Sequence, residues 1–224
     1  RPDAQQPADD EVITWMDKMH AEGRRVVCIN MGTIYYYQPQ DYAHMVQALH
    51  MIHEQNPNVV FLWKIAQRPK HVQNIPSEDE AALPPYVRRL SWIPSMTAVM
   101  EHPALAVMMH HGGGNSLNEC LAYGIPQFCI SQWVDTHDIG LCIRHSGVGL
   151  WSEYSPDFVP EDICSQLLQL VEDKDHKFRH TALAWKLKTQ QAGGTKFAAD
   201  LIQSYVTDYT YASGSSKAPL PHAM

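Results

Sequence analysis

Continuous apolar runs of strand length recur along the chain and are separated by polar turns. The clearest runs are "RRVVCINMG" (24–32), "NVVFLWKI" (58–65), "ALAVMMH" (104–110) and "PQFCIS" (126–131). Runs that are apolar at every position, without alternation, are typical of strands buried on both faces of a parallel sheet. "YVRRLSWIP" (86–94) and "VGLWS" (148–152) add two shorter predicted strands.

Between the strands, apolar residues recur at helical spacing. In "QPQDYAHMVQALHMIHEQN" (38–56), Met45, Leu49 and Ile52 share one face, and Pro39 suits the first turn. "DEVITWMDKMH" (10–20) places Trp15 and Met19 four residues apart. Further helices are predicted at 95–103, 115–124, 137–147, within 160–191 and over about 195–207.

This alternation predicts an α/β fold with a Rossmann-like, doubly wound, parallel sheet. We expect an interdomain linker and short helix over 1–20, one sheet domain with its last helices over 21–210, and a disordered tail over 211–224. In such sheets, ligands bind beyond the carboxyl ends of the strands. The unusual residues gather there, at Gly32-Thr33, Trp92 to Pro94, His110 to Ser116 and Trp133 to His137.

Composition narrows the function classes. The 224 residues carry a net charge of −7 and no Lys/Arg run longer than two, which argues against a large nucleic-acid interface. No apolar run has the length of a membrane span, and the chain opens on polar residues without a signal peptide or an initiator Met. We therefore expect a fragment of a longer cytoplasmic protein, with peripheral membrane association left open.

The five cysteines are odd in number, widely spaced and mostly within apolar runs, so we expect reduced core thiols. The sequence lacks a CxxC or a Cys/His zinc pattern. Only His110 and His111 are adjacent, and neighbours on a strand point to opposite faces, which suits a metal poorly. We expect no metal cofactor.

The segment "MMHHGGGNSLNECLAYGIP" (108–126) joins a strand to a helix through three glycines. Glycine backbones approach a ligand closely, and a helix N-terminus favours phosphate, to which Asn115, Ser116 and His111 add donors. The alternative is structural, because "SLNE" fits a capping box between Ser116 and Glu119. The motif is neither GxGxxG nor a P-loop, so local sequence leaves both interpretations open.

The wider spacing resembles the donor-binding signature of family-one UDP-dependent glycosyltransferases, which have the GT-B fold, and is closest to the fungal branch. The similar pieces are "WIP" (92–94), "HP" (102–103), "HGGGNSLNE" (111–119), "GIP" (124–126), "WVD" (133–135) and "GVG" (147–149). Similarity extends upstream through "WMDKMHAEGRRVVCINMGT" (15–33), which looks like the family's linker, first strand and phosphate turn.

The resemblance implies a role for each matching residue. Trp92 would stack on uracil, Ile93 would pair with the base through its backbone, and Glu119 would bind both ribose hydroxyls. Asp135 would hold sugar hydroxyls with Trp133 nearby, and Ser95 and Thr136 stand where many relatives carry glutamine. The diphosphate would lie against the remaining candidates: Gly32, Thr33, His111, Gly113, Gly114, Asn115 and Ser116.

The implied protein is the donor-binding half of a UDP-sugar glycosyltransferase, with UDP-glucose as the expected donor. Its partners would be UDP or a UDP-sugar and a missing N-terminal acceptor-binding domain, toward which the last helix would cross. The whole enzyme would transfer the sugar with inversion to a hydroxyl of a lipophilic phenol, sterol or other natural product. We find no catalytic base in this chain, which the family places in the amino-terminal half. A UDP-sugar epimerase of the same fold and a non-catalytic UDP-binding domain are the alternatives.

Overall fold

A computed structural model of the chain describes residues 11–77 and 82–212. Residues 1–10 of the predicted linker and 213–224 of the predicted tail lie outside the described residues. By their contacts, the residues form two compact units that divide between Lys186 and Leu187, whereas the sequence assigned 21–210 to one domain.

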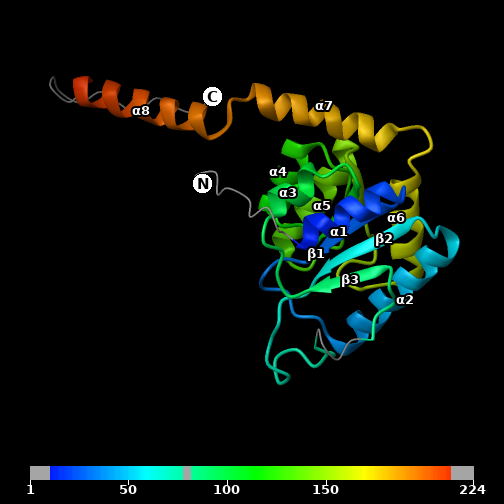
Figure 1. Cartoon of the computed structure of the whole chain (residues 1–224). Coiled ribbons are helices and arrows are strands. Elements are labelled where there is room, and N and C mark those ends of the chain that lie inside the picture. The colour runs from blue at the N-terminus through cyan, green and yellow to red at the C-terminus, as the bar shows by residue number, and fades with distance from the viewer. Residues whose placement is uncertain (1–10, 78–81, 213–224) are drawn as a thin grey trace. The chain divides into compact units, whose positions relative to one another are not determined.

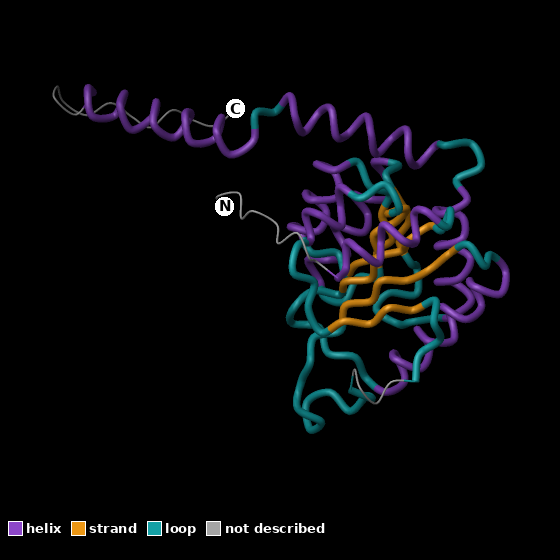
Figure 2. The backbone as a smooth tube through the Cα atoms, viewed as in Figure 1, coloured by secondary structure: helices purple, strands orange, loops and turns teal. Residues whose placement is uncertain are grey.

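The first unit is built on one parallel sheet of six strands in the order β3-β2-β1-β4-β5-β6. Figure 2 shows the strands as a single layer with helices on both sides. The predicted doubly wound α/β fold is confirmed. The strands are β1 (Arg25–Asn30), β2 (Val59–Lys64), β3 (Val87–Leu90), β4 (Leu105–His110), β5 (Gln127–Cys129) and β6 (Gly149–Trp151).

The helices follow the predicted order (Figure 1). Those predicted around Met45 and before Gly124 are confirmed within one or two residues, and Pro39 is the first residue of its helix, as expected. The helices are α1 (Glu11–Ala21), α2 (Pro39–Gln55), α3 (Met96–Glu101), α4 (Gly114–Tyr123), α5 (Val134–Ser146), α6 (Pro160–Glu172), α7 (Lys177–Gln191) and α8 (Gly194–Ala212).

The sheet is covered on both faces. Helices α2 and α6 pack over one face, where Met45, Leu49 and Leu167 join the odd-numbered strand residues Val27 and Ile29. Helices α1, α3 and α4 pack over the other face, in a cluster that holds the even-numbered Val26, Cys28 and Met108. Both faces are therefore buried from solvent, which explains why the strands are apolar at every position.

Helix α1 belongs to this core and is more than a linker. Its buried side chains are Val12, Met16 and Met19, which pack in the same cluster as the strands. Of the predicted pair, Met19 is buried, whereas Trp15 is only partly buried at the edge of the cluster. Residues spaced three and four apart, not one pair alone, define the buried stripe of a helix.

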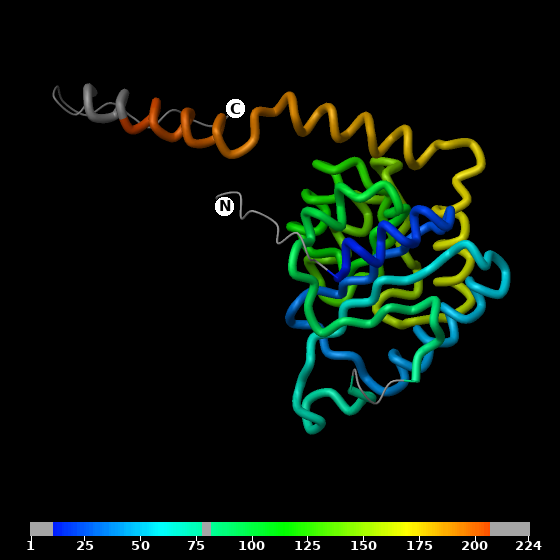
Figure 3. The backbone as a smooth tube through the Cα atoms, in the orientation of Figure 1, coloured from blue at the N-terminus to red at the C-terminus, as the bar shows by residue number. Residues whose placement is uncertain are grey.

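Between β2 and β3, the residues that the structure describes form a long loop, where a βαβ crossover usually has a helix (Figure 3). Gln73, which is buried, fastens it to the body of the fold. Its side-chain Oε1 accepts the backbone N–H of Tyr37 at 3.0 Å, and its Nε2 donates to the carbonyl of Ala66 at 3.2 Å. The loop therefore stands beside the β1–α2 turn at the carboxyl edge of the sheet.

The cysteines are all free thiols, as expected. Four of them are buried, and Cys142 on α5 is exposed. Burial raises the pKa of Cys28 to about 12 and of Cys129 to about 11, because the thiolate would lose its hydration.

In the second unit, α8 carries a run of exposed apolar side chains. Lys196 and Asp200 form an ion pair of 2.8 Å along its surface. The exposed apolar residues are Phe197, Leu201, Ile202, Tyr205 and Val206. None of the helices that the structure describes is long and apolar enough to cross a lipid bilayer.

Candidate functional site

The predicted site residues follow the carboxyl ends of four strands of the sheet. Gly32 follows β1, Trp92 follows β3, His111 follows β4 and Trp133 follows β5. Because all strands are parallel, these ends meet at one edge of the sheet, on the side to which the arrow of β3 points in Figure 1. Trp92 is 63% exposed, which is unusual for so large an apolar ring and suits a stacking surface.

The glycine turn opens helix α4 earlier than the capping hypothesis requires. Gly113 is the residue before the helix, and the first helical hydrogen bond runs from Leu117 N–H to the Gly113 carbonyl at 3.1 Å. The proposed capping box between Ser116 and Glu119 is therefore wrong, because Ser116 already lies inside the first turn. The backbone N–H groups of Gly114, Asn115 and Ser116 precede that first bond and point out of the helix end, where an anion binds.

The three glycines have different roles. Gly112 has a φ of +87°, a conformation that side chains rarely adopt, whereas a Cβ added at Gly114 would meet nothing within 4 Å. A Cβ at Gly113 would lie 2.7 Å from Nε2 of His111, and one at Gly32 would lie 2.7 Å from its Cε1. Gly32 and Gly113 thus leave room for the imidazole ring, and only Gly114 faces open space.

The imidazole of His111 lies between two turns of the site. Its ring makes an edge-to-face contact with Trp133, with centroids 5.4 Å apart. Its Nδ1 is buried and has no hydrogen-bond partner in the structure. Burial lowers the pKa of His111, the carboxylate of Asp135 opposes this, and the ammonium of Lys64 lowers it further. We therefore expect a neutral His111 at pH 7.

His110 takes no part in the surface of the site. It is fully buried; its Nδ1 accepts the backbone N–H of Gly112 at 3.1 Å and its Nε2 pairs with Oε1 of Gln127 at 2.9 Å. These bonds fix the tautomer with its proton on Nε2. His110 thus supports the glycine turn from inside the fold.

Lys64 is a site residue that sequence reasoning missed. It ends β2 and is only 6% exposed. Its Nζ lies 5.2 Å from the centre of the Trp92 ring, and 3.4 Å from both Asn30 Oδ1 and the Gly32 carbonyl. The signal was present in "NVVFLWKI", where one lysine interrupts an otherwise apolar strand at its carboxyl end.

Asp135 and Thr136 lie in a different local structure from the one predicted, and only Asp135 is exposed. Helix α5 starts at Val134, so Asp135 lies in its first turn and not in the polar turn expected before residue 137. Thr136 is 2% exposed, and its hydroxyl accepts the N–H groups of Gln132 and Trp133 and donates to the Trp133 carbonyl. The assignment of Thr136 to the donor surface is therefore withdrawn, whereas Asp135 is exposed beside His111.

The remaining candidates differ in what they present. Ile93 has its side chain in the core, which leaves its backbone as the group at the surface. Ser95 caps α3, since its hydroxyl accepts the N–H of Ala98 at 3.2 Å. Thr33 is exposed, and its carbonyl accepts a hydrogen bond from Arg68 of the β2–β3 loop. Glu119 is exposed on the second turn of α4.

The glycine geometry gives a first prediction. Gly113→Ala is expected to weaken binding of a phosphate ligand about tenfold, because the new methyl group must displace the His111 ring. Gly114→Ala is expected to change stability by no more than about 0.5 kcal/mol, since the methyl enters open space at a helix start. Thermal melts and UDP titration of the two variants test this pair. Equal behaviour of both would refute the distinct roles of the glycines.

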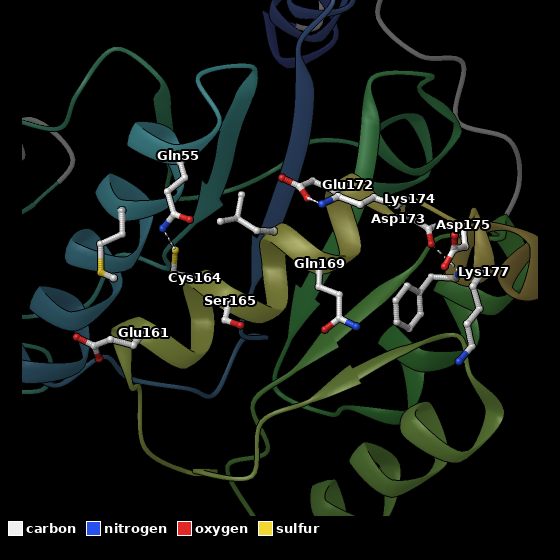
Figure 4. A pocket seen from close by; sticks show the side chains of 13 residues that line it. Gln55, Glu161, Cys164, Ser165, Gln169, Glu172, Asp173, Lys174, Asp175 and Lys177 are labelled. Carbon is white, nitrogen blue, oxygen red and sulfur yellow. Dashed lines mark hydrogen bonds and ion pairs between the residues drawn. The ribbon is translucent and has the colours of Figure 1, made fainter.

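A separate hollow of about 700 Å³ lies along α2 and α6 (Figure 4). There the Gln55 amide donates to the Cys164 sulfur at 3.3 Å, and Glu172 pairs with Lys174 at 3.4 Å. None of the predicted site residues lines it. Within the part of the chain that the structure describes, three or more His, Cys, Asp or Glu side chains nowhere gather as a metal site would require.

We compared the chain with known proteins by sequence and by structure. Residues 70–201 match the family described as Erythromycin biosynthesis protein CIII-like, C-terminal domain. Erythritol-mannosyl-transferase 1 of Mycosarcoma maydis is 25% identical over 86% of this chain and 41% of its own length. Its namesake in Pseudozyma antarctica (strain T-34) is 37% identical over 54% of this chain and 20% of its own length. The chain thus spans less than half the length of these curated relatives.

Solved structures share the fold. The crystal structure of UDP-glucose:anthocyanidin 3-O-glucosyltransferase in complex with UDP superposes with a TM-score of 0.68 at 22% identity, over 87% of this chain and 42% of that chain. This similarity concerns the parallel α/β architecture of GT-B glycosyltransferases. The sequence match over residues 70–201 shows that the chain belongs to the family of Erythromycin biosynthesis protein CIII-like C-terminal domains, and its fold is that seen in GT-B glycosyltransferases.

Proposed function

We propose that this chain is the donor-binding half of a glycosyltransferase that uses a UDP-sugar. The observation that carries the proposal is the meeting of three features at one edge of the sheet: the open N-terminus of α4, the Gly32 turn beside His111 and the exposed ring of Trp92. A helix end suits a diphosphate, and an exposed indole suits a base. Glu119, exposed on the same helix as the phosphate donors, is the proposed ligand of the ribose hydroxyls.

The backbone N–H groups at the start of α4 also suggest how the leaving nucleotide would be stabilised. Negative charge grows on the phosphate oxygen as the glycosidic bond to the sugar breaks. Fixed N–H groups at the start of α4 and the nearby His111 side chain would receive that charge without reorganising. We expect no metal ion in this scheme, so UDP affinity should be the same with and without a chelator.

UDP-glucose is the proposed donor, and a lipophilic alcohol or phenol is the proposed acceptor. The fungal relatives favour a second candidate, since their names specify mannosyl transfer and erythritol, a polyol. Titrations with UDP and GDP compare a pyrimidine with a purine base on the same surface. They therefore show which nucleotide the site binds, but not which sugar the nucleotide carries. Turnover of UDP-glucose and of nucleotide-linked mannose by the full-length protein would then identify the sugar.

The rest of the enzyme is proposed to lie in an N-terminal half that binds the acceptor and carries the base. The exposed apolar side chains of α8, among them Phe197 and Leu201, are expected to contact that half. We further propose a cytoplasmic location, which the five free thiols support. By itself, this chain should bind UDP and transfer little sugar.

Titration of site variants tests the proposal. Trp92→Ala is expected to weaken UDP binding about 10- to 100-fold by removing the stacking surface. Glu119→Ala is expected to weaken it about tenfold, and to weaken 2′-deoxy-UDP less, because one of the two hydroxyl partners is already missing. Calorimetry of the wild-type chain and both variants is the measurement, with Glu101→Ala on α3 as the matched removal of one carboxylate.

The outcomes separate the alternatives. Wild-type protein that does not bind UDP would overturn the proposed function. Binding that is unchanged in both variants would overturn the site assignment alone. Interconversion of a free UDP-sugar without acceptor would favour the epimerase, and binding without turnover by the full-length protein would favour a non-catalytic domain.

A further inference from the structure

The charge of Lys64 has no partner of opposite sign in the part of the chain that the structure describes. The two oxygen atoms within reach of its Nζ belong to the Asn30 amide and the Gly32 carbonyl, both neutral and both at 3.4 Å. The ion pairs of the described residues all involve other cations. Two other groups act on its pKa: the Cys28 thiol, which stays protonated because burial raises its own pKa to about 12, and the guanidinium of Arg68, which has the same sign as Lys64.

An arrangement of this kind is costly for the fold. A buried ammonium loses its hydration, and hydrogen bonds of 3.4 Å to neutral oxygens replace it poorly. Accordingly, burial lowers the pKa of Lys64; the Cys28 thiol opposes this shift, and the Arg68 charge adds to it. A methionine would fill the same volume at the end of β2 without this cost, so the packing of the fold does not explain the lysine.

The position of the ammonium suggests what compensates it. Lys64 lies between the Trp92 ring, at 5.2 Å, and the Gly32 turn. His111 lies against the same turn, and the Lys64 charge reaches it. A nucleotide whose base stacked on Trp92 and whose phosphates reached the start of α4 would pass the ammonium on its way.

We propose that Lys64 is a binding residue for the diphosphate of the sugar nucleotide and supplies the positive charge of this site. The inference rests on the proposed function and adds to it the group that meets the phosphate charge. His111, being neutral, contributes a hydrogen bond, the α4 N-terminus contributes N–H dipoles, and Lys64 contributes a full charge. A charge-assisted hydrogen bond to phosphate is roughly twice as strong as a neutral one.

The competing explanation is structural, because Lys64 also contacts Asn30 and Gly32 and could only hold the turn. Two substitutions separate these roles. Lys64→Met keeps the volume and removes both the charge and the hydrogen bonds. Lys64→Gln keeps a donor for Asn30 and Gly32 and removes the charge alone. Lys174→Met, at an exposed lysine in the hollow along α6, removes one charge elsewhere and is the matched control.

The experiment compares UDP with uridine on the wild-type chain and these variants, by calorimetry with a thermal melt of each protein. Both Lys64 variants are expected to weaken UDP binding about 10- to 100-fold, to leave uridine binding within about twofold and to melt no lower than wild type. Lys174→Met is expected to bind both ligands like wild type.

Each other result has one reading. Wild-type binding of UDP with unchanged affinity in both Lys64 variants would overturn this inference and leave the proposed function intact. Equal losses for UDP and uridine, or a lower melting temperature in Lys64→Met with full UDP affinity in Lys64→Gln, would assign Lys64 to the turn and overturn the inference too. Absence of UDP binding by the wild-type chain would instead overturn the proposed function on which it rests.

Discussion

Gly149→Ala is expected to lower the free energy of unfolding by about 3 kcal/mol or more, an effect at the upper end for a single added methyl group. Gly149 begins β6 and pairs with Gln127 of β5. A Cβ at this position would lie 1.9 Å from the carbonyl oxygen of Gln127 and 2.7 Å from its carbonyl carbon. The obstacle is backbone within the sheet, which cannot turn aside as a side chain would, so the two strands must separate.

Denaturant unfolding of Gly149→Ala and wild type measures this effect. Gly114→Ala is the matched control, because the same methyl group enters open space there. The damage should also spread to the site, since Gln127 is the hydrogen-bond partner of His110 beneath the glycine turn. A stability loss of less than about 1 kcal/mol would mean that β6 is not held against β5 as closely as described.

Acidification is expected to destabilise the first unit by about 3 kcal/mol through His110 alone between pH 6.5 and pH 4. Burial lowers the pKa of this histidine from 6.5 to about 4, with the Gln127 hydrogen bond opposing and the nearby His111 adding to the shift. Protonation would also place a proton on Nδ1, which faces the N–H of Gly112. The folded state therefore remains neutral at His110 while the unfolded state takes up a proton.

The sign of the effect follows from this difference. Above pH 6.5 neither state binds the proton and His110 has no influence on stability. As the pH falls below 6.5, only the unfolded state gains, and the loss continues until the folded state also titrates near pH 4. His111 adds to the loss in the same direction, because burial lowers its pKa as well.

Two measurements check this prediction. NMR of the imidazole resonances should show His110 neutral down to about pH 4. Between pH 7 and pH 4, the free energy of unfolding should depend less steeply on pH in His110→Gln than in wild type, by up to about 1.4 kcal/mol per pH unit. The exposed His145 near the end of α5 supplies the control variant. A His110 resonance that titrates near pH 6.5 would contradict the description of this imidazole as buried and hydrogen-bonded at both ring nitrogens.

Most of the fold could be predicted from the sequence because burial on both faces of a parallel sheet leaves a direct pattern. The runs around Val27, Leu62 and Val107 became β1, β2 and β4, and Pro39 marked the start of α2. The predicted helix starts were wrong where the start depends on a turn made by the preceding segment. Ser116 had the sequence of an N-cap, but the residue before α4 is Gly113, three positions earlier, and it follows the positive-φ residue Gly112.

The site could be predicted as a set of loops and less well as individual roles. The strand ends brought Gly32, Trp92 and His111 to one edge, as parallel topology requires. Roles that depend on contacts between distant segments could not be read from spacing. Thr136 turned inward to satisfy two backbone N–H groups, and Lys64 came beside Trp92 only through the pairing of β2 with β1 and β3.

The distribution of the thiols has a practical consequence for following this protein in solution. Four sulfur atoms are enclosed by the fold, and only that of Cys142 on α5 is open to solvent. A maleimide dye added to the native protein should therefore react with Cys142 alone, and denaturation should make the other four thiols accessible to the dye. The chain thus carries a natural attachment point for a fluorophore or spin label on the helix that begins beside Trp133, where the arrival of a ligand could be recorded without engineering a new cysteine.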